Sequence, residues 1–115
     1  MTITQLQEGP VILIGYEYRL QLEAEADLFP EGAAFAGQLR STIAATSVLA
    51  EVSTSAGSVL RLNERTLEIV LTPAITSSLM AGGVVLDLVR TDLTPDRHLG
   101  FLLEIPVALP VTRGL

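Results

Sequence analysis

A two-residue alternation of apolar and polar side chains runs through most of this 115-residue chain. It is clearest at residues 16–23, where tyrosines and leucines alternate with charged and amide residues. Successive side chains of a β-strand point to opposite faces, so this period predicts half-buried strands. Further predicted strands are residues 34–41, 46–54, 59–62, 66–72, 84–91 and 101–111. Short strands separated by turns every ~8–12 residues predict an all-β fold, either a β-sandwich or a barrel.

The stretch LTPAITSSLMAGGVVLDLVR, residues 71–90, interrupts the alternation. Thr72 suits a helix N-cap and Pro73 suits the first helical position, where its missing N–H costs nothing. The glycine pair beginning at Gly82 suits the end of a helix, because glycine tolerates the left-handed conformation found there. We therefore expect one short helix between two strands, from about Pro73 to Met80, which carries the chain from one sheet to the other. The side chains expected on its buried side are Ile75, Leu79 and Met80.

Both ends of the chain depart from simple alternation. Residues 11–14, VILI, are apolar on both faces, so this segment is either covered on both sides or paired with another chain. The last predicted strand contains Pro106 and Pro110, which cannot donate to a β-ladder, and is expected at a sheet edge or at a bend between sheets. At this length we expect a single domain, residues 1–115, with extended ends at about 1–10 and 107–115.

The composition favours contact with other protein chains. Hydrophobic residues make up 49% of the chain and charged residues only 17%, against a usual charged share of about 25%. A small domain cannot bury every apolar side chain, so some apolar surface is expected to meet another subunit. We expect a homo-oligomer or ring. The residues predicted to make subunit or partner contacts are Val11, Ile12, Ile14, Leu109, Val111 and Arg113.

Charge and residue usage exclude several classes of function. The net charge is −6, and all seven basic residues are arginines without a cluster, which disfavours a nucleic-acid partner. The absence of cysteine excludes disulfides, zinc–thiolate sites and thiol catalysis. The first residues lack the pattern of a signal peptide, and no apolar run approaches ~18 residues. We therefore expect no membrane partner and synthesis in the cytoplasm without a signal peptide.

No catalytic, cofactor-binding or metal-binding set can be assembled from the sequence, so an enzyme is not expected. His98 is the only histidine, and in a polar loop it is expected to be solvated rather than part of a catalytic triad. The carboxylates Asp87, Asp92 and Asp96 fall short of the six to eight oxygens that calcium takes. Asp87 is instead expected to pair with Arg40 across neighbouring strands.

The order of these segments resembles that of small immunoglobulin-like domains in structural proteins of tailed phages and prophages. In particular, the chain is similar to the N-terminal domains of upper baseplate proteins. The resemblance covers about residues 16–113 and includes a short helix of the form T-x-x-L-x-x-G, a strand with "D-L" and a closing "V-T". The residues that carry it are Thr76, Leu79, Gly82, Asp87, Leu88, Val111 and Thr112, with Arg40 at the end of the second strand.

The resemblance implies an immunoglobulin-like antiparallel β-sandwich that works without catalysis. It implies a virion structural protein, an assembly or adaptor module in a baseplate, tail-fibre attachment, neck or head decoration, whose partners are other virion proteins. The alternative is a carbohydrate-binding or adhesin module at a virion or cell surface, with Tyr16 and Tyr18 as the aromatic residues to test. The chain has no tryptophan, and sugar-binding modules usually present aromatic platforms, so this alternative is the less favoured one.

Overall fold

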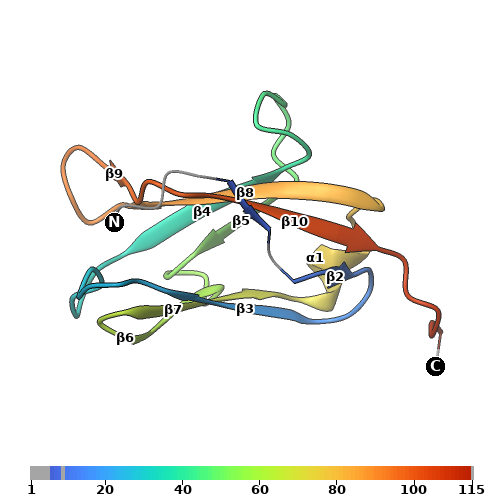
Figure 1. Cartoon of the computed structure of the whole chain (residues 1–115), viewed down its shortest axis with the longest axis horizontal. Helices are drawn as coiled ribbons and strands as arrows, with labels where there is room; N and C mark the ends of the chain where they lie inside the picture. Colours follow the sequence, from blue (N-terminus) through green and yellow to red (C-terminus); the bar gives the residue numbers. More distant parts are fainter. Residues whose placement is uncertain (1–5, 9, 115) are drawn as a thin grey trace.

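The protein is a β-sandwich with one short helix, seen in a computed structural model that describes residues 6–8 and 10–114 (Figure 1). Predicted extended-end residues 1–5, 9 and 115 lie outside the described part. The elements are β1 (Leu6–Glu8), β2 (Ile12–Leu13), β3 (Tyr18–Glu23), β4 (Phe35–Arg40), β5 (Ala50–Ser53), β6 (Val59–Asn63), β7 (Thr66–Leu71), α1 (Pro73–Ser77), β8 (Gly82–Arg90), β9 (Arg97–His98) and β10 (Leu102–Ala108).

Two sheets pack face to face. The larger has the order β1-β10-β8-β4-β5, with β2 also on β10 and β9 on β8, and the smaller has the order β3-β7-β6. The pairs are antiparallel except that β1 and β2 both run parallel to β10. An immunoglobulin-like sandwich divides its strands between two sheets in this way, with sequence neighbours often in opposite sheets. The predicted all-β sandwich is confirmed.

The core consists of the inward-facing side chains of both sheets. Along β8 buried and half-buried residues alternate, as the two-residue period predicts. Phe29, in the turn before β4, packs its ring edge against Phe35 at a centroid distance of 5.5 Å, a favoured geometry for aromatic pairs. The other fully or nearly fully buried apolar side chains include Leu39, Val52, Val59, Leu67, Ile69, Leu71, Val84, Leu88 and Ile105.

The helix crosses from the smaller sheet to the larger one, because it joins β7 to β8. Thr72 is its N-cap, and the Thr72 hydroxyl accepts a hydrogen bond from the Ile75 backbone N–H at 3.4 Å. The helix ends at Ser77, earlier than the predicted Met80. Ser78 explains the early end. Its hydroxyl donates a hydrogen bond to the Ile75 carbonyl oxygen at 2.6 Å, and its backbone N–H donates to the same oxygen.

The early helix end changes the position of one side chain. Leu79 is buried at 5% exposure, as predicted, whereas Met80 is 82% exposed. The expectation that Met80 faces the core was wrong, because helical spacing no longer applies beyond Ser78. Met80 belongs to the surface.

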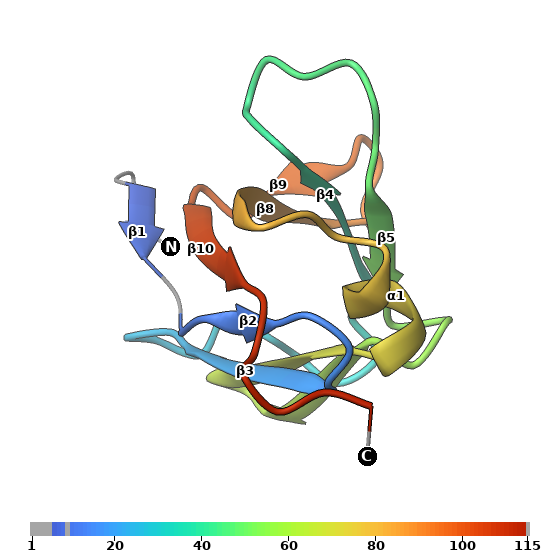
Figure 2. The same ribbon diagram turned by 90° about the vertical axis from the view of Figure 1, so that its right-hand side faces the viewer.

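The C-terminal strand is not at a free edge, contrary to the prediction from its prolines. β1 and β2 both lie along its outer side (Figure 2). The register joins Glu8 to Glu104 and Ile12 to Val107, so Pro106 lies opposite the interval between β1 and β2. A residue that cannot donate to the ladder is tolerated at such an interruption. Pro110 lies beyond the strand and is buried.

The strand predicted at residues 46–54 is shorter than expected. β5 begins at Ala50, and residues 41–49 form a loop that projects from the larger sheet (Figure 2). Arg40 holds the base of this loop, because its guanidinium donates to the Ala45 carbonyl oxygen at 3.0 Å. The loop places Ile43 in solvent at 62% exposure.

Candidate subunit-contact surface

One threonine of the helix fixes the turn that joins β2 to β3. Thr76 is completely buried. Its hydroxyl accepts a hydrogen bond from the Gly15 backbone N–H at 3.1 Å and donates one to the Tyr16 carbonyl oxygen at 2.9 Å. Buried backbone groups need such partners. Thr76 therefore ties the turn to the helix, and it sets the position of the Tyr16 side chain.

The C-terminal segment closes over the same turn. The Ile14 backbone N–H donates to the Ala108 carbonyl oxygen at 3.0 Å, and the Tyr16 hydroxyl donates to the Thr112 carbonyl oxygen at 2.7 Å. At the first residue of β3, the Tyr18 hydroxyl donates to the Pro10 carbonyl oxygen at 2.8 Å. Burial raises the pKa of Tyr18 to about 12. Segments from both ends of the chain are thus held together beside α1.

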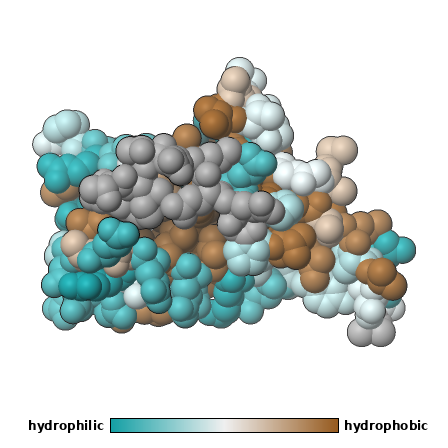
Figure 3. Space-filling model, in the orientation of Figure 1, coloured by the Kyte–Doolittle hydropathy of each residue, from teal (hydrophilic) through white to brown (hydrophobic). Residues whose placement is uncertain are grey.

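Six large apolar side chains remain exposed on these segments. They lie in and just before β2, in the turn after it, in the segment between α1 and β8, and in the segment after β10. These parts of the chain are at the end of the sandwich where the C-terminus leaves (Figure 1). Apolar surface is visible at this end in the space-filling view (Figure 3). We name these residues the helix-end surface: Val11, Leu13, Tyr16, Met80, Leu109 and Val111. A gathering of exposed apolar side chains is typical of protein interaction sites.

The structure brings together half of the residues predicted from sequence as contacts. Val11, Leu109 and Val111 belong to the helix-end surface, and Val111 is 97% exposed. Arg113 is exposed beside them. Ile12, by contrast, is fully buried in the core. It cannot make a surface contact in this fold.

Strand pairing explains this correction. β2 pairs with β10 in the register Ile12 to Val107, and Val107 faces the core. Ile12 therefore faces inward, and Val11 and Leu13 face outward. Ile14 is half-buried against the core. Leu13 and Tyr16 were missed, although the alternation through residues 11–14 could have separated outward from inward side chains.

The polar candidates form isolated pairs. His98 is not freely solvated as expected, since its Nε2 lies 2.7 Å from Asp87 Oδ2. The predicted Asp87–Arg40 pair was wrong, because Gln38, not Arg40, lies opposite Asp87 in the register. Among residues 6–8 and 10–114, no group of three or more potential ligands could hold a metal ion.

Asp92 provides a prediction for acid conditions. The Asp92 pKa is lowered from 3.8 to about 2. The main cause is hydrogen bonding from the Arg90 guanidinium, and a smaller contribution comes from the Ala34 backbone N–H. Its stabilising contribution is therefore complete above pH 3.8 and is lost as pH falls towards 2. We expect Asp92→Asn to lower stability at neutral pH and to differ progressively less from the parent protein between pH 3.8 and 2.

Urea unfolding at a series of pH values measures this effect. Arg90→Gln removes the same pairing from the other side, so it should reproduce the pH dependence of Asp92→Asn. A stability difference that stays constant down to pH 2 would contradict the assignment.

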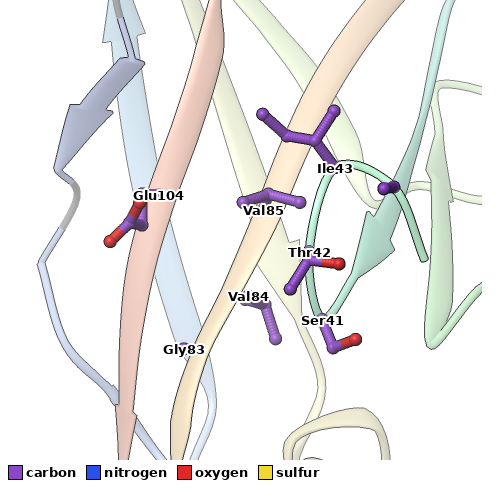
Figure 4. A pocket seen from close by; sticks show the side chains of 8 residues that line it. Ser41, Thr42, Ile43, Gly83, Val84, Val85 and Glu104 are labelled. Carbon is purple, nitrogen blue, oxygen red and sulfur yellow. The ribbon is translucent and has the colours of Figure 1, made fainter.

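A shallow groove lies on the outer face of the larger sheet. It has a volume of about 480 Å³, with loop residues including Ser41, Thr42 and Ile43 on one side and Val85 and Glu104 on the other (Figure 4). Glu104 is the one carboxylate of its lining, and no histidine accompanies the two hydroxyl groups.

The two tyrosines differ in exposure. Tyr18 is only 6% exposed, so its ring cannot stack on a ligand. Tyr16 is exposed, but its hydroxyl is engaged by Thr112. The glycan-binding alternative therefore loses one of its two tyrosines.

Two further observations concern the class of protein. Within the described ranges no helix is long and apolar enough to cross a membrane. Comparison with protein-family models and with curated proteins finds no match to this chain.

Proposed function

We propose that this protein is a non-enzymatic structural module of a phage or prophage virion, which assembles through its helix-end surface with copies of itself and with neighbouring virion proteins. The observation that carries the proposal is the concentration of six exposed apolar side chains at one end of the sandwich. Burying such side chains on association contributes about 25 cal/mol per Å², before the costs of association are subtracted.

The ion pairs on the smaller sheet support this choice by contrast. The outer face of the smaller sheet carries Arg19, which forms ion pairs with Glu17 at 3.2 Å and with Glu68 at 2.8 Å. Exposed pairs of this kind suit contact with water and add little to stability. Because each copy carries a net charge of −6, charged faces of two copies repel. The uncharged helix-end surface avoids that repulsion.

The residues that carry the phage-domain resemblance also shape this end. Thr76 holds the turn at Tyr16, Leu79 is a core residue beside the helix, and Gly82 adopts a φ of +134° where the chain enters β8. A side chain is strongly disfavoured at that φ. The motif therefore has a structural reason, which is to form the helix end on which the apolar side chains sit.

Acidic substitutions on this surface test the proposal. Val111 and Leu109 are 97% and 57% exposed, so Leu109→Asp and Val111→Asp should fold normally. We expect the wild-type protein to form a defined oligomer in light-scattering measurements and the double variant to dissociate at least tenfold more readily, ~1.4 kcal/mol. Ile43→Asp, at 62% exposure on a different surface, is the matched control and should leave the oligomer intact.

Two results would overturn the proposal. One is a wild-type protein that stays monomeric at all concentrations and binds no purified virion protein. The other is an oligomer that the double variant leaves intact. Neighbouring genes that encode tail or capsid proteins would support the virion assignment independently of self-association.

A further inference from the structure

His98 lies where two strands bring a carboxylate and a backbone amide to opposite sides of its ring. β9 pairs with the end of β8 so that His98 is opposite Val89. Val89 and Asp87 are two residues apart on β8 and share the outer face of the larger sheet, so Asp87 is a diagonal neighbour of His98. This register, which local sequence does not reveal, places Asp87 Oδ2 at 2.7 Å from His98 Nε2.

The second ring nitrogen fixes the tautomer. The Gly100 backbone N–H donates to His98 Nδ1 at 2.8 Å. A nitrogen that accepts this bond must carry a lone pair, so the proton of the neutral ring is on Nε2, and Nε2–H donates to Asp87. Both ring nitrogens are thus used, one as donor and one as acceptor.

We propose that His98 is a proton-sensitive latch for the turn that ends the loop of residues 91–100. Protonation of the neutral ring adds a hydrogen to Nδ1, which then faces the Gly100 N–H, and two donors cannot form a hydrogen bond. The negative charge of Asp87 holds the imidazolium at Nε2. The ring therefore stays on Asp87 and the Gly100 contact opens.

The surroundings confine the change to this turn. Leu99 is anchored, since its side chain is in the core and its backbone N–H donates to the Leu88 carbonyl oxygen at 3.0 Å. Gly100 has a φ of +85° and, as glycine, can adopt other conformations at little cost. The turn can therefore move at Gly100 while Leu99 keeps its place.

Other charged groups near the latch largely neutralise one another. Arg90 is paired with Asp92 at 2.6 Å, and Asp27 is paired with Arg65 at 2.6 Å. The charged groups around the latch are Asp87 and Arg90 on β8, Arg97 on β9, Asp96 in the loop and Asp27 on the facing segment. Asp87 alone among them has a hydrogen bond to the ring in the described part of the chain.

The latch controls one wall of a cleft. His98, Leu99 and Gly100 lie on one side of a space of about 460 Å³, with Leu28 and Pro30 on the facing segment. Acidification adds a positive charge to this wall and releases the Gly100 end of it. The cleft at this end of the molecule is therefore expected to differ in shape and charge between the neutral and the protonated state of His98.

Nuclear magnetic resonance of the ¹⁵N-labelled protein tests the latch. We expect the ring nitrogens at pH 8 to show the Nε2–H pattern. We expect the Gly100 amide proton to shift upfield as His98 is protonated, with the same midpoint. We also expect this amide to lose protection, measured as its exchange rate relative to the intrinsic rate at the same pH, because intrinsic exchange itself slows as pH falls. The amide of Gly57, a positive-φ turn glycine between β5 and β6, is the internal reference and should not follow that midpoint.

A substitution separates the latch from general effects of acid. In His98→Gln the side chain cannot be protonated, so lowering the pH from 8 should no longer change the Gly100 amide. An Nδ1–H tautomer in the parent protein would overturn the proposal. So would a Gly100 amide that ignores the His98 titration, or one that still follows pH in His98→Gln.

Discussion

Thr76→Val is expected to destabilise the protein by ~2–3 kcal/mol, although it replaces one β-branched side chain with another of nearly the same shape. The hydroxyl it removes satisfies two backbone groups, the Gly15 N–H and the Tyr16 carbonyl. A polar group left unpaired away from water costs ~1–3 kcal/mol. Because both hydrogen bonds are only partly buried, we take the lowest quarter of the summed range of ~2–6 kcal/mol. This loss is a large fraction of the ~5–15 kcal/mol free energy of unfolding that is typical of a single domain.

Thr76→Ser is the matched control for that experiment. It keeps the hydroxyl and removes one methyl group, so it should cost no more than ~1 kcal/mol. Urea unfolding followed by circular dichroism measures both variants. The proposed role of the hydroxyl is wrong if valine and serine at this position give equal stability. In the valine variant we also expect weaker self-association, because the turn that carries Tyr16 is no longer held against the helix.

The regular elements could be predicted because they follow from local rules. Alternation at residues 18–23 separates an inward face from an exposed one, and Thr72 and Pro73 mark a helix start by their own chemistry. The crossing between sheets also followed, since a helix was expected between two strands of a sandwich. These features need no knowledge of which strands become neighbours.

The failures concern contacts that depend on register between distant segments. Ile12 was expected on the surface, but its burial is decided by the pairing with Val107, about ninety residues away. The pairing of His98 with Asp87 likewise depends on how β9 meets β8. Met80 was misplaced for a different reason, since the Ser78 hydroxyl competes for the Ile75 carbonyl oxygen in the helix.

The candidate surface was predictable only in composition. The low share of charged residues indicated that apolar side chains would remain outside, and Val111 and Leu109 were rightly expected to be among them. Its shape was not predictable, because it requires the segment after β10 to return to Tyr16 through a hydrogen bond with Thr112. Local patterns cannot specify such a contact between the two ends of a chain.

Gly37→Ala is expected to destabilise the protein by about 3 kcal/mol or to prevent folding. Gly37 lies in the middle of β4, where β5 and β8 pair on either side. A methyl group at this position would overlap the Asp87 carbonyl oxygen and lie 2.7 Å from Leu88 Cδ2. Overpacking of an ordered interior commonly costs ~1–3 kcal/mol, occasionally more, and here the obstructing atom is backbone. The neighbouring strand would have to move to admit it.

Gly83→Ala provides a test of this reasoning within the same sheet. Gly83 lies in β8, and a methyl group there would be 3.5 Å from the Ile105 carbonyl oxygen, an ordinary van der Waals distance. Alanine also restricts the unfolded chain more than glycine, which stabilises a protein by about 0.4–1 kcal/mol at unstrained positions. We therefore expect Gly83→Ala to be neutral or slightly stabilising in urea unfolding. If the two variants unfold at the same urea concentration, the close approach of β8 to β4 at Gly37 is not what requires glycine there.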